Sequence, residues 1–204
     1  MKKIFNLSFA AAILLASCTQ TEKVKEEFAF QTETFADLKL IRYQVPGFEK
    51  LSLQQQKLVY YLSEAGYAGR DIIWDQNYRH NLSIRRALEN IVLNFDGDKT
   101  SEDWQNFMTY TKRVWFANGI HHHYSMVKFT PDFSKEYFMG LMETTGASLN
   151  EEAMAAIFDA TFDAKKVNLD PKTGLVLGSA INFYDADINE AEVDTYFASI
   201  KDNK

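Results

Sequence analysis

The spacing of apolar residues between positions 84 and 95 constrains the fold more than any other feature of this chain. Apolar side chains recur there at offsets 0, 3, 4, 7, 8 and 11, the positions of Ile84, Ala87, Leu88, Ile91, Val92 and Phe95. This spacing places all of them on one face of an α-helix. We therefore predict a helix that Asn81 or Ser83 caps and that Asp96-Gly97 ends.

Other stretches show the same helical periodicity. Helices are expected after Ser52, from Thr100 or Asp103, after Ser134, after Ser148 with Glu151 as a capping box, and from Asn189. Only 3 Pro and 9 Gly interrupt a chain that is 46% apolar, so long elements around a sizeable core are favoured. Lys172-Thr173-Gly174 resembles a turn, with Leu175–Leu177 as a strand beyond it. The expected fold class is mainly α with a few short strands (α+β).

Three adjacent histidines, His121, His122 and His123, follow Asn118-Gly119, where Gly119 is expected to end a helix in a left-handed conformation. The dipole at a helix C-terminus favours imidazolium, so at least one of them is expected to titrate usefully. In an extended segment His122 points away from the other two, so the three cannot hold one metal ion. They are expected to line a cleft, form a hydrogen-bonded turn, or belong to the core.

The N-terminus has the features of a bacterial lipoprotein signal. Lys2 and Lys3 precede a short apolar stretch, and the sequence Leu15-Ala16-Ser17-Cys18 resembles a lipobox. Cleavage after residues 1–17 would leave Cys18 as a lipidated N-terminus, although a lone cysteine at the end of an ordinary secretory signal is the alternative. Residues 18–34 are polar and are expected to be a tether. The protein is thus expected at a membrane of the cell envelope, facing the periplasm, held through the Cys18 lipid alone.

The net charge of −6 makes nucleic acid an improbable partner, because a phosphate backbone attracts basic surfaces. Arg70 with Asp71, and Arg85 with Arg86, are cleft residues, residues of a solvated face, or structural ion pairs.

Several short segments together suggest a family. The longest runs from Lys112 to Tyr124, and the others are Tyr43–Phe48, Gly69–Ile72, Asp75–Asn77, Ile84–Arg86, Lys166–Asn168 and Asn182–Asp185. In this order they resemble the dipeptidyl peptidase III family of zinc peptidases, in particular its Bacteroides-type members. The resemblance spans roughly residues 37 to 200.

The resemblance implies one lobe of a two-lobed peptidase with a wide cleft, which removes dipeptides from peptide N-termini. Its zinc ligands and catalytic glutamate lie in an H-E-x-x-G-H motif, with a further glutamate motif beyond, and neither occurs in this sequence. Residues 35–204 are therefore expected to form the mostly helical N-terminal lobe, inactive alone. The implied partners are a peptide substrate and the missing C-terminal catalytic lobe, and zinc belongs to the complete enzyme.

The resemblance also implies which residues face the peptide. Eukaryotic members carry glycine, asparagine and tyrosine ahead of a Lys-Phe pair. Gly119 and Lys128-Phe129 fit that pattern, with His121 at the tyrosine position. The expected substrate-binding residues are Asn118, Gly119, His121, His122, His123, Tyr124 and Lys128, with no catalytic residue and no metal ligand in this chain. A non-catalytic peptide-binding lipoprotein domain and a fragment of a longer reading frame without a role of its own remain the alternatives.

Overall fold

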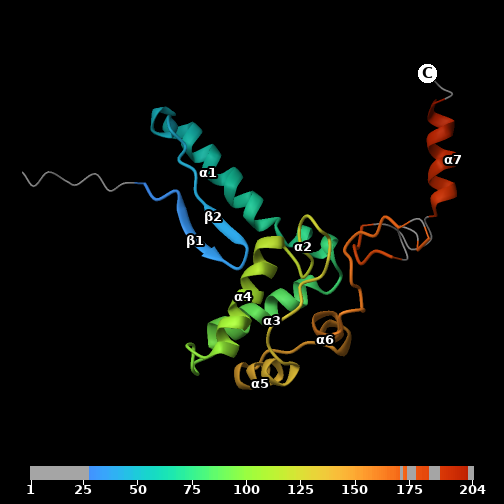
Figure 1. The fold of residues 1–204 in the computed structure, drawn as a ribbon. Helices are drawn as coiled ribbons and strands as arrows, with labels where there is room; N and C mark the ends of the chain where they lie inside the picture. Colours follow the sequence, from blue (N-terminus) through green and yellow to red (C-terminus); the bar gives the residue numbers. More distant parts are fainter. Residues whose placement is uncertain (1–27, 171, 174–177, 184–188, 202–204) are drawn as a thin grey trace, which may run out of the picture.

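The structure is a computed structural model that describes residues 28–170, 172–173, 178–183 and 189–201. It is mainly helical with a two-stranded antiparallel sheet, which confirms the expected fold class (Figure 1). Its elements are β1 (Gln31–Phe35), β2 (Leu38–Ile41), the 3-10 turn η1 (Phe48–Lys50), α1 (Leu53–Ala68), α2 (Asp71–Asn77), α3 (Asn81–Asn94), α4 (Glu102–Ala117), α5 (Lys135–Thr145), α6 (Glu151–Phe158) and α7 (Glu190–Lys201). No helix of the described chain is both long and apolar enough to cross a bilayer.

The core lies between α3, α4, α5 and α6, and α3 packs against α2, α4 and α5. The predicted stripe on α3 is confirmed, since Ile84, Leu88 and Ile91 are fully buried. They pack into one cluster with buried residues of the neighbouring helices, among them Phe107, Val114, Phe138, Leu141 and Ile157. Burial of each large apolar side chain stabilises the fold by about 1.5–3 kcal/mol relative to exposure.

Helix caps agree with the sequence in two cases and differ in two. Ser52 forms a capping box with Gln55, and the Ser134 hydroxyl accepts the Tyr137 amide, as expected. The helix expected to begin at Thr100 and Asp103 is α4, which Ser101 caps while the Thr100 hydroxyl donates to Asp98. Asn150 caps α6 in place of Ser148. α3 starts at Asn81, and neither Asn81 nor Ser83 caps it, because Asn81 lies inside the helix with a buried side chain. Polar residues one or two positions apart compete for a cap, and the sequence alone does not rank them.

The β1–β2 hairpin was not expected, and β1 begins within residues 18–34, the range assigned to a tether. Phe35 pairs with Leu38 across a turn in which Ala36 has a left-handed conformation. Ion pairs fix the hairpin to α4: Lys112 contacts Glu33, and Arg113 lies 2.9 Å from Asp37. These long-range contacts connect the hairpin to the body through charged side chains.

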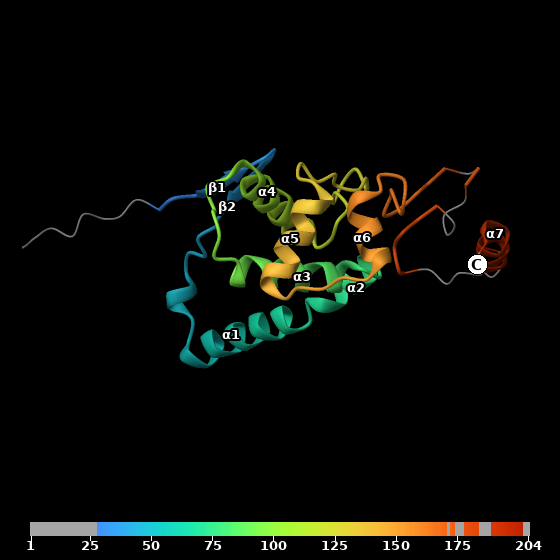
Figure 2. The same ribbon diagram turned by 90° about the horizontal axis from the view of Figure 1, so that it is seen from below.

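The predicted helix after Ser52 forms, but none of its residues is buried. Its largest apolar side chains, from Leu53 to Leu62, are 43 to 67% exposed. α7 likewise has no buried residue, although its spacing predicts that Val193, either Tyr196 or Phe197, and Ile200 face inward. Figures 1 and 2 show α1 and α7 standing apart from the body on different sides.

Residues beyond 164 pair with the histidine segment without forming a named strand. Lys165 bridges Val127, and the Ala180 amide donates to the Lys165 carbonyl. The Thr173 amide donates to the Asp170 carbonyl, as a turn at residues 172–173 requires. The strand expected at residues 175–177 lies outside the described residues.

Candidate functional site

The junction after α4 is held by two asparagines. The Asn118 carbonyl accepts bonds from the Asn77 side chain at 3.0 Å and from the Asn81 side chain at 3.5 Å. Asn81 also donates to the Trp74 carbonyl and accepts the Ile120 amide at 3.1 Å, while being only 1% exposed. Asn81 therefore clamps α2, α3 and the chain after α4 together, a role that its expected function as a cap did not reveal.

The left-handed residue at this junction is Asn118, with φ 53°, and not Gly119 as expected. Asparagine adopts this conformation more readily than most residues. Gly119 is needed for a different reason: its φ is 152°, and a Cβ there would lie 2.3 Å from Nδ2 of Asn81. The glycine thus allows the backbone to pass close to the Asn81 clamp.

The chain next forms a tight hairpin-like loop. Phe129 donates to the Ile120 carbonyl, His121 bridges Lys128, and the His122 amide donates to the Val127 carbonyl at 2.8 Å. Residues 123–125 turn, so the extended geometry that would place His121 and His123 on one face is wrong. Instead the rings of His122 and His123 stack with centroids 4.5 Å apart.

His121 takes the buried alternative. Its ring is 2% exposed and packs edge-on against Tyr78. Its Nε2 lies 2.7 Å from the Asp163 carbonyl, which can only accept, so Nε2 carries the proton. Burial lowers the pKa of His121 to about 4, and the charges of Lys128 and Lys166 act in the same direction. The expectation that the helix dipole stabilises imidazolium is wrong at this position, because desolvation outweighs it.

His122, His123 and Tyr124 lie at the surface turn. Nδ1 of His122 accepts the amides of Tyr124 and Ser125, each at 3.1 Å. The His123 ring lies between His122, Tyr124 and Phe116, and desolvation followed by the nearby His122 lowers its pKa. Tyr124 is 82% exposed. These rings can stack on a peptide, while His121 cannot reach one without movement of the loop that covers it.

Lys128 has an internal role. Its ammonium donates to the carbonyls of Asp159 and Phe162, where α6 ends, and burial lowers its pKa. The side chain of Asp163 in the same loop accepts the Tyr78 hydroxyl at 2.6 Å and pairs with Arg79 at 3.1 Å. Backbone carbonyls of the loop at residues 159–163 therefore position both His121 and Lys128 through hydrogen bonds.

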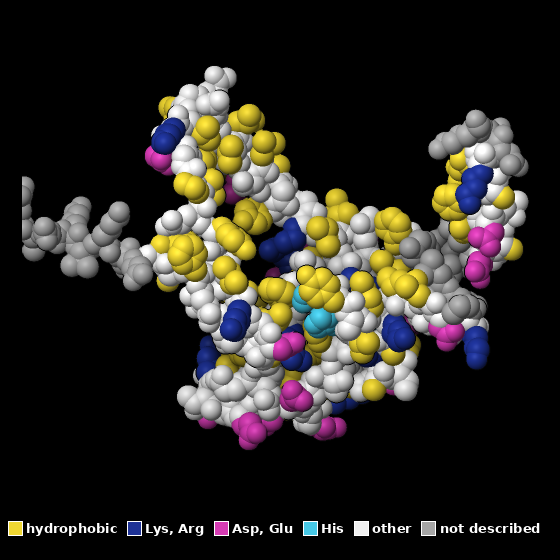
Figure 3. Space-filling view, turned by 45° about the horizontal axis from the view of Figure 1, so that its top comes forward, with side chains coloured by type: hydrophobic (Ala, Val, Ile, Leu, Met, Phe, Trp, Pro, Cys, Tyr) yellow, Lys and Arg dark blue, Asp and Glu magenta, His cyan; other side chains and the backbone are white. Residues whose placement is uncertain are grey.

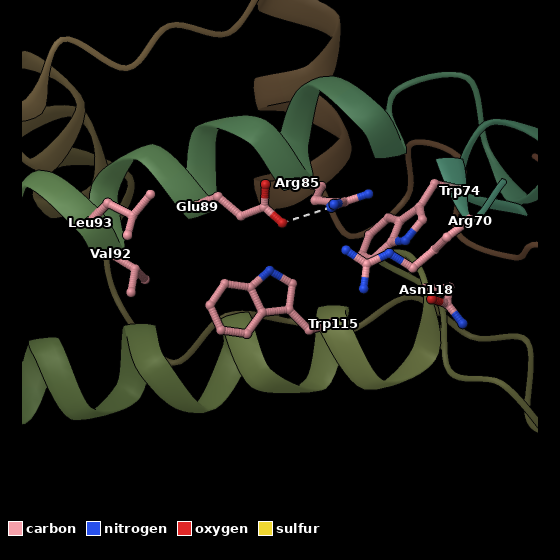
Figure 4. Close-up of a pocket in the computed structure, with 8 residues that line it drawn as sticks. All are labelled: Arg70, Trp74, Arg85, Glu89, Val92, Leu93, Trp115 and Asn118. Carbon is pink, nitrogen blue, oxygen red and sulfur yellow. Dashed lines mark hydrogen bonds and ion pairs between the residues drawn. The ribbon is translucent and has the colours of Figure 1, made fainter. Parts of the chain in front are cut away.

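A separate hollow of about 380 Å³ lies between α2, α3 and α4 (Figure 4). Its lining consists of Arg70, Trp74, Arg85, Glu89, Val92, Leu93, Trp115 and Asn118. Asn118 is the only one of the predicted substrate-binding residues that lines it. Of the other predicted residues, Gly119 lies against Asn81, and His121 and Lys128 contact the loop at residues 159–163. His122, His123 and Tyr124 lie at the surface turn.

The two arginines that line the hollow, Arg70 and Arg85, differ in their ion pairs. Arg85 forms the structural ion pairs that were considered, to Asp71 at 2.5 Å and to Glu89 at 2.7 Å. Arg70 does not pair with its neighbour Asp71, and no described carboxylate lies within ion-pair distance of it. The sequence pointed to this site through the adjacent pair Arg70-Asp71. In the fold, Arg70 lines the hollow and Asp71 pairs with Arg85 instead.

The histidine segment does not fit a zinc site. His121 uses Nε2 as a donor inside the core, and Nδ1 of His122 already accepts two amides. Within the described ranges, no three His, Cys, Asp or Glu residues come close enough together to hold a metal ion. Imidazoles that coordinate zinc need a free nitrogen lone pair directed at a shared point.

No protein-family model matches this chain, and no curated protein matches it significantly. The interpretation of the site therefore depends on its residues, their geometry and the sequence resemblance described above.

Proposed function

We propose that this chain is the N-terminal lobe of a dipeptidyl peptidase III-type zinc peptidase and forms one wall of its peptide cleft. In the complete enzyme, dipeptides are removed from peptide N-termini. The zinc ligands and the catalytic glutamate belong to a catalytic lobe outside this sequence, which contains no H-E-x-x-G-H motif. A lipid on Cys18 anchors the protein to an envelope membrane on the periplasmic side.

The observation that carries this proposal is the state of α1. The helix has a capping box and large apolar side chains along its length, yet none of its residues is buried. Isolated helices of this length are marginal in water, and contiguous apolar patches on soluble proteins usually mark an interface. A second lobe that covers α1 would explain why the sequence places large apolar side chains on this helix.

The peptide would lie along the face that α1 overhangs. Figure 3 shows apolar side chains along α1, basic side chains beneath it, and histidine side chains on the same face of the body. The stacked rings of His122 and His123 and the exposed Tyr124 offer flat contact surfaces, and Asn118 offers an amide. These groups bind and orient a peptide, and they perform no bond cleavage.

A second candidate is a non-catalytic peptide-binding lipoprotein domain. The hollow between α2, α3 and α4 favours it, because residues of the packed body form this hollow and α1 contributes none of its lining. On this hypothesis the protein would bind peptides with no further lobe.

An activity assay separates the candidates. The purified chain, incubated with a dipeptidyl-naphthylamide and zinc, should give no turnover. A protein that joins the chain to a segment containing H-E-x-x-G-H should give turnover. Zinc-dependent activity that stays with the chain through purification and is lost in His122→Ala would overturn the assignment. Peptide binding by the chain without gain of activity in the joined protein would favour the second candidate.

Lipidation is tested separately by metabolic labelling with a fatty-acid analogue. The wild type should incorporate label and Cys18→Ala should not. Equal labelling of both proteins would refute the anchor.

A further inference from the structure

The hollow between α2, α3 and α4 contains hydrogen-bond donors that lack acceptors. The indole Nε1 groups of Trp74 and Trp115 are buried, and neither has a partner among the described residues. Figure 4 shows the nitrogen edge of the Trp115 indole turned toward α3, below Glu89. Buried polar groups are nearly always hydrogen-bonded in native proteins, so two buried indole donors without acceptors in side chains that line one hollow are an unusual feature of this region.

One of the two cations that line the hollow, Arg70, has no ion pair among the described residues. Arg85 is neutralised by Glu89 and Asp71, so the carboxylate of Glu89, which would repel an anion, is itself engaged. Arg70 has no such partner and lines the same hollow. The Asn118 side-chain amide also lines it, and only the Asn118 carbonyl is used by the Asn81 clamp. The hollow thus combines an available guanidinium with neutral donors.

The rest of the lining is apolar. Trp74 and Trp115 form walls of the hollow, with Val92 and Leu93 on α3. Its volume of about 380 Å³ falls in the range of small-ligand sites. An apolar group therefore fits between the indoles while an anionic group meets Arg70.

We propose that this hollow binds the C-terminal residue of a peptide, with its carboxylate on Arg70 and its apolar side chain between Trp74 and Trp115. The inference rests on the proposed function, in that the chain binds peptides. The C-terminal residue is chosen over an internal acidic residue because it carries a carboxylate and an apolar side chain on the same carbon. Guanidinium and carboxylate form strong, bidentate hydrogen bonds. Because internal and amidated residues lack this combination, the hollow would favour peptides with a free C-terminus.

The test uses the full chain and its intrinsic fluorescence, since two of its three tryptophans line the hollow. Three probes are titrated: acetyl-Ala-Ala-Phe with a free carboxylate, the same peptide as its amide, and acetyl-Ala-Glu-Phe amide. The free acid should bind about tenfold more tightly than either amide. Equal binding of all three overturns the proposal, and tight binding of the glutamate peptide reassigns the hollow to acidic side chains.

Variants then assign the effect. Arg70→Gln should remove the preference for the free acid, Arg70→Lys should keep part of it, and Trp115→Phe should weaken it by a smaller factor. Lys135→Gln, an exposed cation at the start of α5, is the control and should change nothing. Circular dichroism melting confirms that each variant is folded. An acid preference that survives in folded Arg70→Gln contradicts the proposal.

The two proposals fail in different ways. If the amidated peptides bind wild type and Arg70→Gln equally and the free acid binds no better, the hollow is not a carboxylate site but peptide binding stands. If no peptide binds the chain or the protein joined to an H-E-x-x-G-H segment, the proposed function fails as well.

Discussion

α1 and α3 are helices of similar length that both carry large apolar side chains, yet the two helices lie in opposite environments. On α3 the predicted apolar stripe is buried against α4 and α5, whereas on α1 no residue is buried. Periodicity therefore shows that a face must be covered, but it does not show by what. The difference divides the molecule into a packed body and an arm, α1, none of whose residues is buried, and we propose that a further lobe covers this arm.

The largest expected effect contrasts the two helices directly. Leu88→Ala, on the buried face of α3, should lower the free energy of unfolding by about 2–5 kcal/mol through lost burial and a cavity. Leu58→Ala, on α1, should change it by less than about 0.5 kcal/mol. Urea denaturation of both variants checks this. A comparable loss in Leu58→Ala would show that α1 packs against the body.

The next effect is a pH dependence confined to the body. The folded pKa of His121 is about 4 and its ordinary value is 6.5, so between these values the unfolded chain binds more protons. Linkage then predicts that the free energy of unfolding falls as pH drops from about 6.5 to about 4, by about 3 kcal/mol from this group.

The measurement is urea denaturation across that window for wild type and His121→Gln. The pKa values of His80 and His123 are also lowered, so the free energy of unfolding of His121→Gln should still fall somewhat as the pH drops. The slope should nevertheless be clearly smaller in His121→Gln. An identical slope in a folded variant would mean that folding does not lower the pKa of His121.

A third effect tests the junction that joins α2, α3 and α4. Asn81→Ala should cost about 1–3 kcal/mol, because it leaves the buried Ile120 amide without a partner and removes one of the two hydrogen bonds to the Trp74 carbonyl, which keeps its bond from the Tyr78 amide. Asn106→Ala removes an exposed bond to the Asp132 carbonyl and serves as the control. Thermal melting should show a large loss only for Asn81→Ala, and equal losses would contradict the clamp.

The smallest effect compares two serine caps. Ser134→Ala should lower global stability by about 1 kcal/mol, because α5 packs in the core. Ser52→Ala should leave global melting unchanged and only increase fraying at the start of α1. A global loss from Ser52→Ala would place α1 within the cooperative unit.

The sequence predicted the body well because its helices obey one strong rule, the burial of a stripe at helical spacing. It missed α2 and the β1–β2 hairpin, which are short and are ordered by distant contacts such as Arg113 with Asp37. It also located the unusual segment at residues 118–128 but not its geometry. Whether His121 faces a cleft or a core depends on the loop at residue 163, which lies 42 positions away in the sequence.

The hollow was only partly predictable for the same reason. Arg70 and Arg85 were recognised as cleft residues or ion pairs, but nothing in the sequence indicated that Arg85 would be neutralised and Arg70 left without a carboxylate. The two tryptophans belonged to separate helices, and their convergence follows from tertiary packing alone.

The central claim, that α1 is an interface for a missing lobe, is tested most directly by amide hydrogen exchange. In the isolated chain α1 should exchange far faster than α3, because no burial protects it. In a protein that joins this chain to an H-E-x-x-G-H segment, α1 should gain protection approaching that of α3. Protection of α1 equal to that of α3 in the isolated chain, or no gain in the joined protein, would contradict the account.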